Sequence, residues 1–141
     1  MSNDVFFISD HHFGHENMLK FKIDGTEDLV RVFDSVEHMD EEMIKRHNEI
    51  VKPNDRVYFL GDVAIARRNI SRVGCMNGKK VLIKGNHDIF PLKDYTPYFE
   101  DIRAYKMFPK HGIICSHIPV HPEQLEHRFK FNVHGHLHRN L

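Results

Sequence analysis

The chain has 141 residues, 40% of them hydrophobic and 28% charged, which is typical of one folded globular domain spanning residues 1–141. Its twenty basic and twenty acidic residues balance, so no overall positive field exists to gather long nucleic acid. Apolar runs of four or five residues are too short to cross a bilayer, and the N-terminus lacks signal-peptide features, so we expect a cytoplasmic protein with no membrane partner.

The first predicted element is a strand over 5–8, whose continuous apolar run favours burial on both faces. A helix over 35–51 follows, because its apolar residues recur at spacings of three and four and Asp34 or Ser35 can cap its start. Then come a strand over 56–60, a short helix over 69–77, a strand over 79–84, a hairpin of strands 102–108 and 112–116, and a strand over 129–133. This order indicates an α/β fold with at least one partly parallel sheet.

Directly after five of the apolar runs stand side chains of the kinds that bind metal ions. They are Asp10 with His12, Asp62, Asn86 with His87 and Asp88, His117, and His136 with His138. Ligands collect beyond the carboxyl ends of parallel strands, so we expect these side chains to meet at one edge.

The candidate ligands are rich in imidazole, and histidine is unusually frequent in the chain, with thirteen residues. Seven oxygen and nitrogen donors without a thiolate exceed what one tetrahedral ion needs, so two ions bridged by a carboxylate are the economical interpretation. The seven are Asp10, His12, Asp62, Asn86, His117, His136 and His138. The abundance of imidazole favours manganese, with iron, zinc or nickel as alternatives, over calcium or magnesium.

Each residue taken alone has a simpler explanation. Asn86 would usually be a turn residue and Asp62 a helix cap, and only their joint placement after strands favours metal binding. His11 and His15 are better explained as polar loop residues, although His15 could reach the site.

The motifs stand in the order Asp-x-His, Gly-Asp, Gly-Asn-His-Asp, His and Gly-His-x-His, between residues 5 and 138. This order resembles the calcineurin-like metallophosphoesterase superfamily, and the run Asp-His-His-Phe-Gly-His at 10–15 resembles its small phage and bacterial members. The resemblance implies a four-layer α/β/β/α sandwich of two mixed β-sheets.

The resemblance also implies a role for each matching residue. One metal would be held by Asp10, His12 and His138, the other by Asn86, His117 and His136, with Asp62 bridging them. His87 would contact the phosphate and protonate the leaving oxygen, and Asp88 would orient its ring.

The sequence departs from the family in two places. After Gly-Asp, the family's acid and arginine are absent, and Arg67 stands in shifted register as a substrate-binding residue beside Asn86 and His87. The chain also ends three residues after His138, where relatives usually add strands, so we expect a minimal or C-terminally short form whose second sheet a homodimer would cover.

The function expected from these residues is a phosphodiesterase acting on small nucleotide-like esters through metal-activated hydroxide. The alternatives are a phosphomonoesterase of the same fold and a non-catalytic module that keeps the metal site. Further side chains considered for gripping the substrate are Lys84, Arg68, Phe13, Tyr95 and Tyr98.

Overall fold

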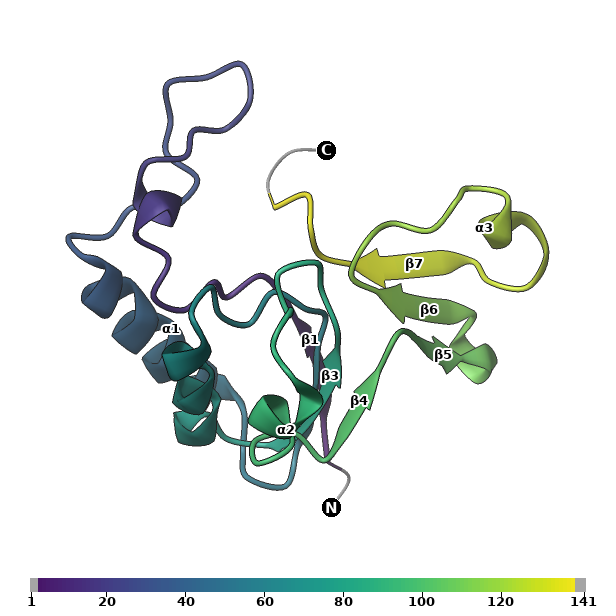
Figure 1. Ribbon diagram of the computed structural model, residues 1–141. Helices are drawn as coiled ribbons and strands as arrows, with labels where there is room; N and C mark the ends of the chain where they lie inside the picture. Colours follow the sequence, from purple (N-terminus) through teal and green to yellow (C-terminus); the bar gives the residue numbers. More distant parts are fainter. Residues whose placement is uncertain (1–2, 139–141) are drawn as a thin grey trace.

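Four parallel strands form the first sheet of the computed structural model, which describes residues 3–138 (Figure 1). In order across the sheet they are β1 (Val5–Ile8), β2 (Arg56–Phe59), β3 (Lys79–Ile83) and β4 (Asp101–Arg103). All three pairings are parallel, so the expectation of a mixed sheet is wrong here. Their carboxyl ends therefore lie on one edge.

The second sheet has three strands, β5 (Lys106–Phe108), β6 (Ile113–Ser116) and β7 (Phe131–His134). β5 and β6 form the predicted antiparallel hairpin, and β7 pairs parallel to β6, so this sheet is mixed. The single strand predicted over 102–108 is wrong, because the chain leaves the first sheet after β4 and enters the second at β5.

The longest helix is α1 (Val36–Ile50), and Ser35 caps it by accepting a 3.0 Å hydrogen bond from the His38 amide, as predicted. The helix predicted over 69–77 starts two residues earlier, as the 3₁₀ helix η2 (Arg67–Cys75). Shorter turns are η1 (Glu16–Leu19), α2 (Leu92–Tyr95), η3 (Pro109–His111) and α3 (Gln124–His127). Among residues 3–138, no helix has the length and apolar character needed to cross a membrane.

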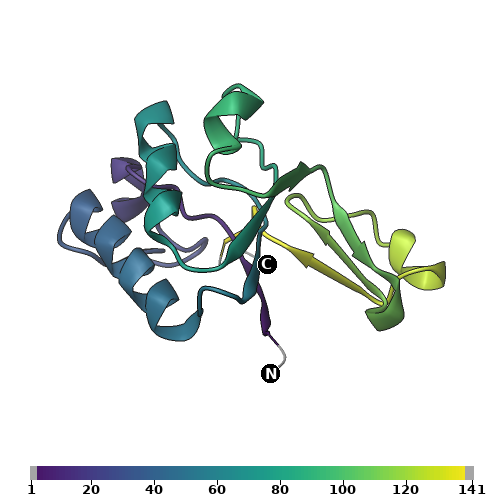
Figure 2. The ribbon, with the colours of Figure 1, turned by 90° about the horizontal axis from the view of Figure 1, so that it is seen from below.

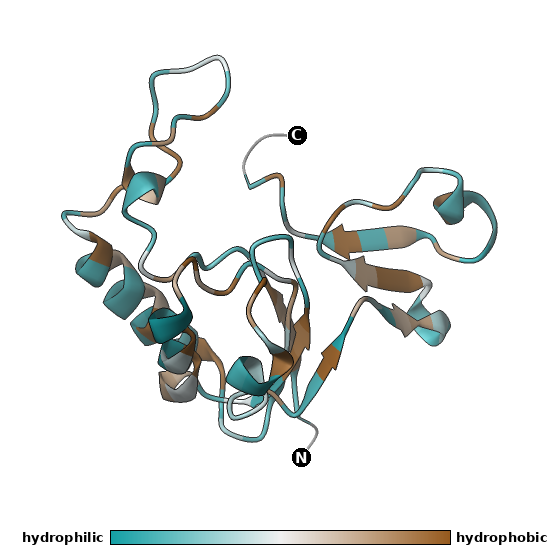
Figure 3. Cartoon of the chain, viewed as in Figure 1, coloured by the Kyte–Doolittle hydropathy of each residue, from teal (hydrophilic) through white to brown (hydrophobic). Residues whose placement is uncertain are grey.

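The first sheet is covered on one face by helices and on the other by the second sheet (Figure 2). Alternate residues of β2 explain both contacts, since successive strand side chains point to opposite faces. Val57 and Phe59 pack in the cluster that includes Met43 of α1, whereas Tyr58 packs with Cys115 of β6. Figure 3 shows the hydrophobic residues concentrated on the strands. The described residues thus make a single small α/β domain with two sheets.

Strand β1 differs from its prediction, because it lies at an edge of the first sheet rather than inside it. Val5 is 50% exposed, and no residue of β1 is fully buried. An apolar run therefore did not guarantee a central strand here.

Candidate metal centre

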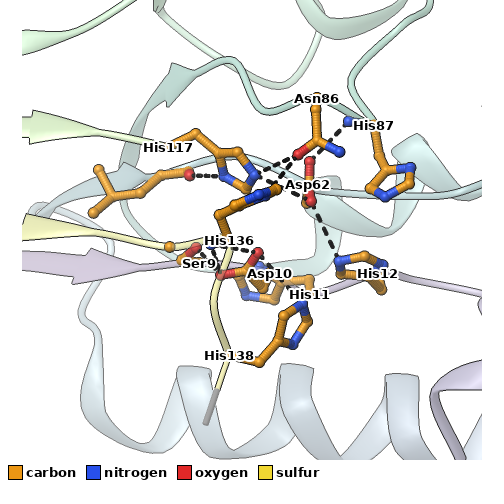
Figure 4. A network of polar contacts seen from close by, with 12 residues as sticks. Ser9, Asp10, His11, His12, Asp62, Asn86, His87, His117, His136 and His138 are labelled. Atoms are coloured by element: carbon orange, nitrogen blue, oxygen red, sulfur yellow. Dashed lines mark hydrogen bonds and ion pairs between the residues drawn. The ribbon is translucent and has the colours of Figure 1, made fainter. Parts of the chain in front are cut away.

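The predicted ligands gather at the carboxyl ends of strands from both sheets (Figure 4). Two groups of three side chains could each hold a metal ion, because within each group the candidate ligand atoms lie within 4.8 Å of one another. We call these groups the first and the second triad. The first triad is Asp10, His12 and His138; the second is Asp62, His117 and His136. The four histidines divide between the triads as the family resemblance implies, and Asp62, which was expected to bridge, is grouped with the second triad.

Asp62, a member of the second triad, also lies close to His12 of the first. Its Oδ2 is 3.4 Å from Nε2 of His12 and 3.2 Å from Nε2 of His117, while its Oδ1 accepts a 2.9 Å hydrogen bond from the His87 amide. Burial alone would raise the pKa of Asp62, but the adjoining rings of His117 and His12, together with the hydrogen bond from the His87 amide, hold it well below its usual value. The carboxylate is therefore ionised and placed where a bridging ligand would be.

Asn86 lies against the second triad, since its Oδ1 is 2.8 Å from Nε2 of His117 and 3.1 Å from Nδ1 of His136. His117 Nδ1 is 2.7 Å from the carbonyl oxygen of Leu60 and must donate to it, so in a neutral ring Nε2 carries a lone pair. That lone pair would face the oxygens of Asn86 and Asp62. A second proton relieves this, and hydrogen bonding to Asp62 does raise the pKa of His117 against the effect of burial. A metal ion would relieve it equally well.

The first triad leaves one nitrogen without a protein partner. His12 Nε2 is buried and makes no hydrogen bond, although it lies 3.4 Å from Asp62. Asp10 accepts hydrogen bonds from the Ser9 hydroxyl and from the His136 amide, at 3.1 and 3.0 Å, and its Oδ1 is 3.8 Å from Nε2 of His138. A buried, unsatisfied nitrogen beside two carboxylates fits a metal ligand.

The backbone is strained at the ligands. Within residues 3–138, the non-glycine residues with positive φ are Asp10, His12, Asp62, His136 and His138, at 51° to 72°. Each left-handed residue other than glycine costs on the order of 1 kcal/mol, and such strain concentrates at functional sites. Gly61, with φ of 100°, is a turn where a side chain cannot fit, since a Cβ there would lie 2.6 Å from Nδ1 of His117.

His87 is exposed, and its ring centroid lies 5.3 Å from that of His12. Asp88 has a different role from the one expected. Its carboxylate accepts hydrogen bonds from the amides of Gly85, Asp62 and Val63 at 2.7, 2.8 and 2.9 Å, so it ties the corner after β2 to the corner after β3. Burial raises the pKa of Asp88. The expectation that Asp88 orients the His87 ring is therefore wrong.

Arg67 is not brought to the triads. Its guanidinium donates to Asp94 at 2.6 Å, and with Arg68 and Lys93 it lines a hollow that includes no ligand residue. Phe13 and Tyr95 are fully buried, so they cannot contact a substrate. We had considered these residues for substrate binding from their chemical type alone, because no motif placed them at the site.

Two further residues support the first triad. His15 Nδ1 lies 3.1 Å from Nδ1 of His12, as its i, i+3 spacing permits. Arg31 donates to the carbonyl oxygens of His11, at 2.6 Å, and of Asp10. Nothing in the sequence indicated Arg31, because it lies in an irregular loop. His11 does lie in the loop after β1, as predicted, but its side chain is buried: it stacks on Phe59, and burial followed by the charge of Arg31 lowers its pKa to about 3.

Comparison with known proteins finds relatives whose names assign no activity. No protein-family model matches the chain. It is 37% identical over 90 residues to "Uncharacterized protein MJ1445" of Methanocaldococcus jannaschii, which covers 61% of this chain and 47% of that protein. It is 28% identical over 123 residues to "Gene 66 protein" of Mycobacterium phage L5, covering 84% and 52%. The chain thus spans about half the length of these curated relatives.

A solved structure has a similar fold. This is the protein of unknown function AQ665 from Aquifex aeolicus, with a TM-score of 0.67 and 27% identity, over 89% of this chain and 69% of that one. The two-sheet α/β arrangement thus recurs in a protein that shares about a quarter of its residues with this chain.

Proposed function

We propose that this chain is a dinuclear metal-dependent phosphoesterase of the calcineurin-like type, acting on small nucleotide-like phosphodiesters. One observation carries the proposal: Asp62 Oδ2 lies 3.4 Å from a ring nitrogen of the first triad and 3.2 Å from one of the second. A carboxylate shared in this way suits two neighbouring divalent ions, which catalyse phosphoryl displacement when about 3.5 to 4 Å apart.

The donor set fits such ions. Asp10, His12 and His138 would hold one, His117, His136 and Asn86 the other, and Asp62 both, with manganese favoured over iron, zinc or nickel. Ions bound there would provide a nucleophilic water at neutral pH and stabilise charge on the phosphoryl oxygens.

His87 would give a proton to the leaving oxygen. Its amide is fixed by Asp62 while its ring is exposed next to His12, so the imidazole can reach an ester placed against the first triad. Imidazole transfers protons efficiently near neutral pH. The exposure of both Asn86 and His87 leaves room for a second ester group, which favours a diester over a monoester.

The four-layer α/β/β/α sandwich is part of the same proposal. What supports it is the order of helices, first sheet and second sheet, together with the antiparallel hairpin that opens the second sheet.

The test compares bis-p-nitrophenyl phosphate with p-nitrophenyl phosphate in manganese, using wild type, His87→Ala and the control His111→Ala, which changes an exposed histidine of η3, in the turn between β5 and β6. We expect faster diester cleavage, only a small loss in kcat for His87→Ala at unchanged metal content, because p-nitrophenolate leaves with little help from a proton, and no loss for the control. For a diester with an alkyl leaving group, the loss for His87→Ala should be about 10²–10⁴-fold.

Two results would redirect the proposal. Faster cleavage of the monoester would favour a phosphomonoesterase. No turnover of either ester by a fully metallated wild type would favour a non-catalytic metal-binding module.

A further inference from the structure

A row of aromatic rings leads from the metal centre to the surface. The centroid distances are 5.3 Å from His87 to His12, 5.3 Å from His12 to His15, and 5.7 Å from His15 to Phe21. The His12 and His15 rings are stacked, with 20° between their planes, and Phe21 meets His15 edge-on, at 80°. We call these four residues the aromatic row.

Phe21 is the outer end of the row and the apolar residue in it. Its side chain is 46% exposed, although other phenylalanines of the chain, such as Phe13 and Phe59, are fully buried. A single exposed phenyl ring is common on protein surfaces, and Phe131 is 59% exposed. What sets Phe21 apart is its place in the aromatic row, three rings from His87, which indicates a cover that belongs to the substrate.

Phe21 is held in place rather than carried on a free loop. It lies in the arm, residues 20–31, which projects past the ends of the strands of the first sheet (Figure 1). Within the arm, Val30 donates to the Phe21 carbonyl at 2.8 Å, and Ile23 donates to Asp28 at 2.9 Å.

The end of the arm is anchored beneath the first triad. Arg31 donates to the carbonyl oxygens of Asp10 and His11, and its guanidinium contacts the Met39 and Met43 sulfurs of α1 at 3.6 and 3.7 Å. One residue therefore couples the position of the arm to the position of a ligand. A ring fixed in this way binds a flat partner with little loss of entropy.

We propose that Phe21, with His15 behind it, stacks against the base of a nucleotide substrate, and that the arm is the specificity element of the site. This inference rests on the proposed function, whose site it extends. Aromatic side chains stack on every base, so the expected preference is for nucleotides over other phosphate esters and not for one base. It also explains how a protein without net charge would select a nucleotide, namely by stacking of an aromatic ring on the base rather than by long-range electrostatic attraction of the phosphate.

The first test is a binding measurement. The chain has no tryptophan, so Phe21→Trp provides a single fluorescent reporter at the end of the row. With the manganese-loaded protein, we expect AMP to quench this fluorescence saturably and ribose 5-phosphate to leave it unchanged. The control is Phe131→Trp, at a 59% exposed phenylalanine at the start of β7, which AMP should not quench. Equal responses to both ligands, or to neither, would overturn the inference.

The second test uses two diesters with the same leaving group, thymidine 5′-p-nitrophenyl phosphate and ethyl p-nitrophenyl phosphate. We expect Phe21→Ala to lower the ratio of kcat/KM for the first to that for the second by about tenfold, mainly through KM, and Phe21→Tyr to restore it. An unchanged ratio in an active variant contradicts the stacking role while the phosphoesterase proposal stands. If wild type cleaves neither ester, the proposed function fails, and the fluorescence titration alone decides whether Phe21 binds a base.

Discussion

The two triads are built differently although one carboxylate, that of Asp62, lies close to a ring nitrogen of each. In the second, His117 is held by Leu60 at 2.7 Å and by Asn86 at 2.8 Å, and Asn86 also reaches His136 at 3.1 Å. The donors of the first contact one another less closely: His138 is 3.8 Å from Asp10, and His12 Nε2 has no hydrogen bond.

The support for the first triad comes instead from outside it. Arg31 holds the Asp10 carbonyl, the His136 amide holds the Asp10 carboxylate, and His15 contacts the far nitrogen of His12. Preorganised donors bind a metal more tightly than donors that must still converge. The second triad should therefore be the tighter site, and the first the one whose properties depend on the surrounding loops.

The largest effect is expected where the triads join. Asp62→Asn keeps the size of the side chain but removes the negative charge shared by both sites, so we expect loss of at least one ion and a fall of about 10³-fold or more in diester hydrolysis. Metal content by mass spectrometry, together with kcat, measures both. An active variant with two bound ions would show that Asp62 is not a bridging ligand.

Two half-buried histidines that follow β7, His136 and His138, can be used to test which triad binds its metal ion more tightly. His136→Ala removes a donor of the second triad and His138→Ala one of the first. In competition with a chelator, we expect each variant to release one ion about 10- to 100-fold more readily than wild type does. We expect the remaining ion to be held more tightly in His138→Ala, where the second triad is intact. The reverse order would overturn the ranking of the sites.

The positions of most strands along the chain, and the polar corners that follow them, were predictable from the sequence because both depend on local signals. An apolar run predicts a strand, and a polar side chain after it predicts a ligand at the sheet edge. Where burial depends on distant neighbours, prediction failed: β1 is an edge strand, and the run 102–108 divides between two sheets.

Residue roles that depend on loop geometry were also beyond the sequence. Asp88 stands next to His87, which suggested a pair, yet its carboxylate turns to three backbone amides. Arg31 and Phe21 lie in a segment without periodicity, so no pattern indicated that it returns to the site. The prediction that Arg67 binds substrate was wrong because its guanidinium instead donates to Asp94, away from the triads.

Substitution of Arg31, which anchors the arm, tests the same comparison between the triads with a smaller expected effect. Arg31→Met removes buried hydrogen bonds to two carbonyl groups while keeping much of the apolar stem, so we expect a loss of about 1–3 kcal/mol in the free energy of unfolding of the metal-free protein. Because the anchor supports Asp10, affinity for the first ion should fall and that for the second should not. Chemical unfolding and chelator competition measure the two effects, and Arg46→Met, at an exposed arginine on α1, is the control. Equal weakening of both ions would mean that Arg31 supports the whole site rather than the first triad.

The smallest expected effect concerns Asp40, which supports the loop of the first triad from α1. Its carboxylate is 1% exposed, accepts hydrogen bonds from the Gly14 amide at 3.2 and 2.9 Å, and lies 3.1 Å from Nε of Arg72. Burial raises its pKa to about 6, against the opposing effects of Arg72 and Gly14.

Because the pKa of Asp40 is higher in the folded protein than in the unfolded chain, the folded state holds this proton more tightly. The resulting stability is present in full below about pH 4 and is lost as the pH rises through about 6. Between pH 5 and 8 we therefore expect wild type to lose about 1 kcal/mol relative to Asp40→Asn, which cannot ionise. Urea unfolding of both metal-free proteins across this range measures the difference, and other titrating groups cancel in the comparison. A difference independent of pH would mean that Asp40 is already ionised at pH 5 and that its ion pair with Arg72 outweighs its burial.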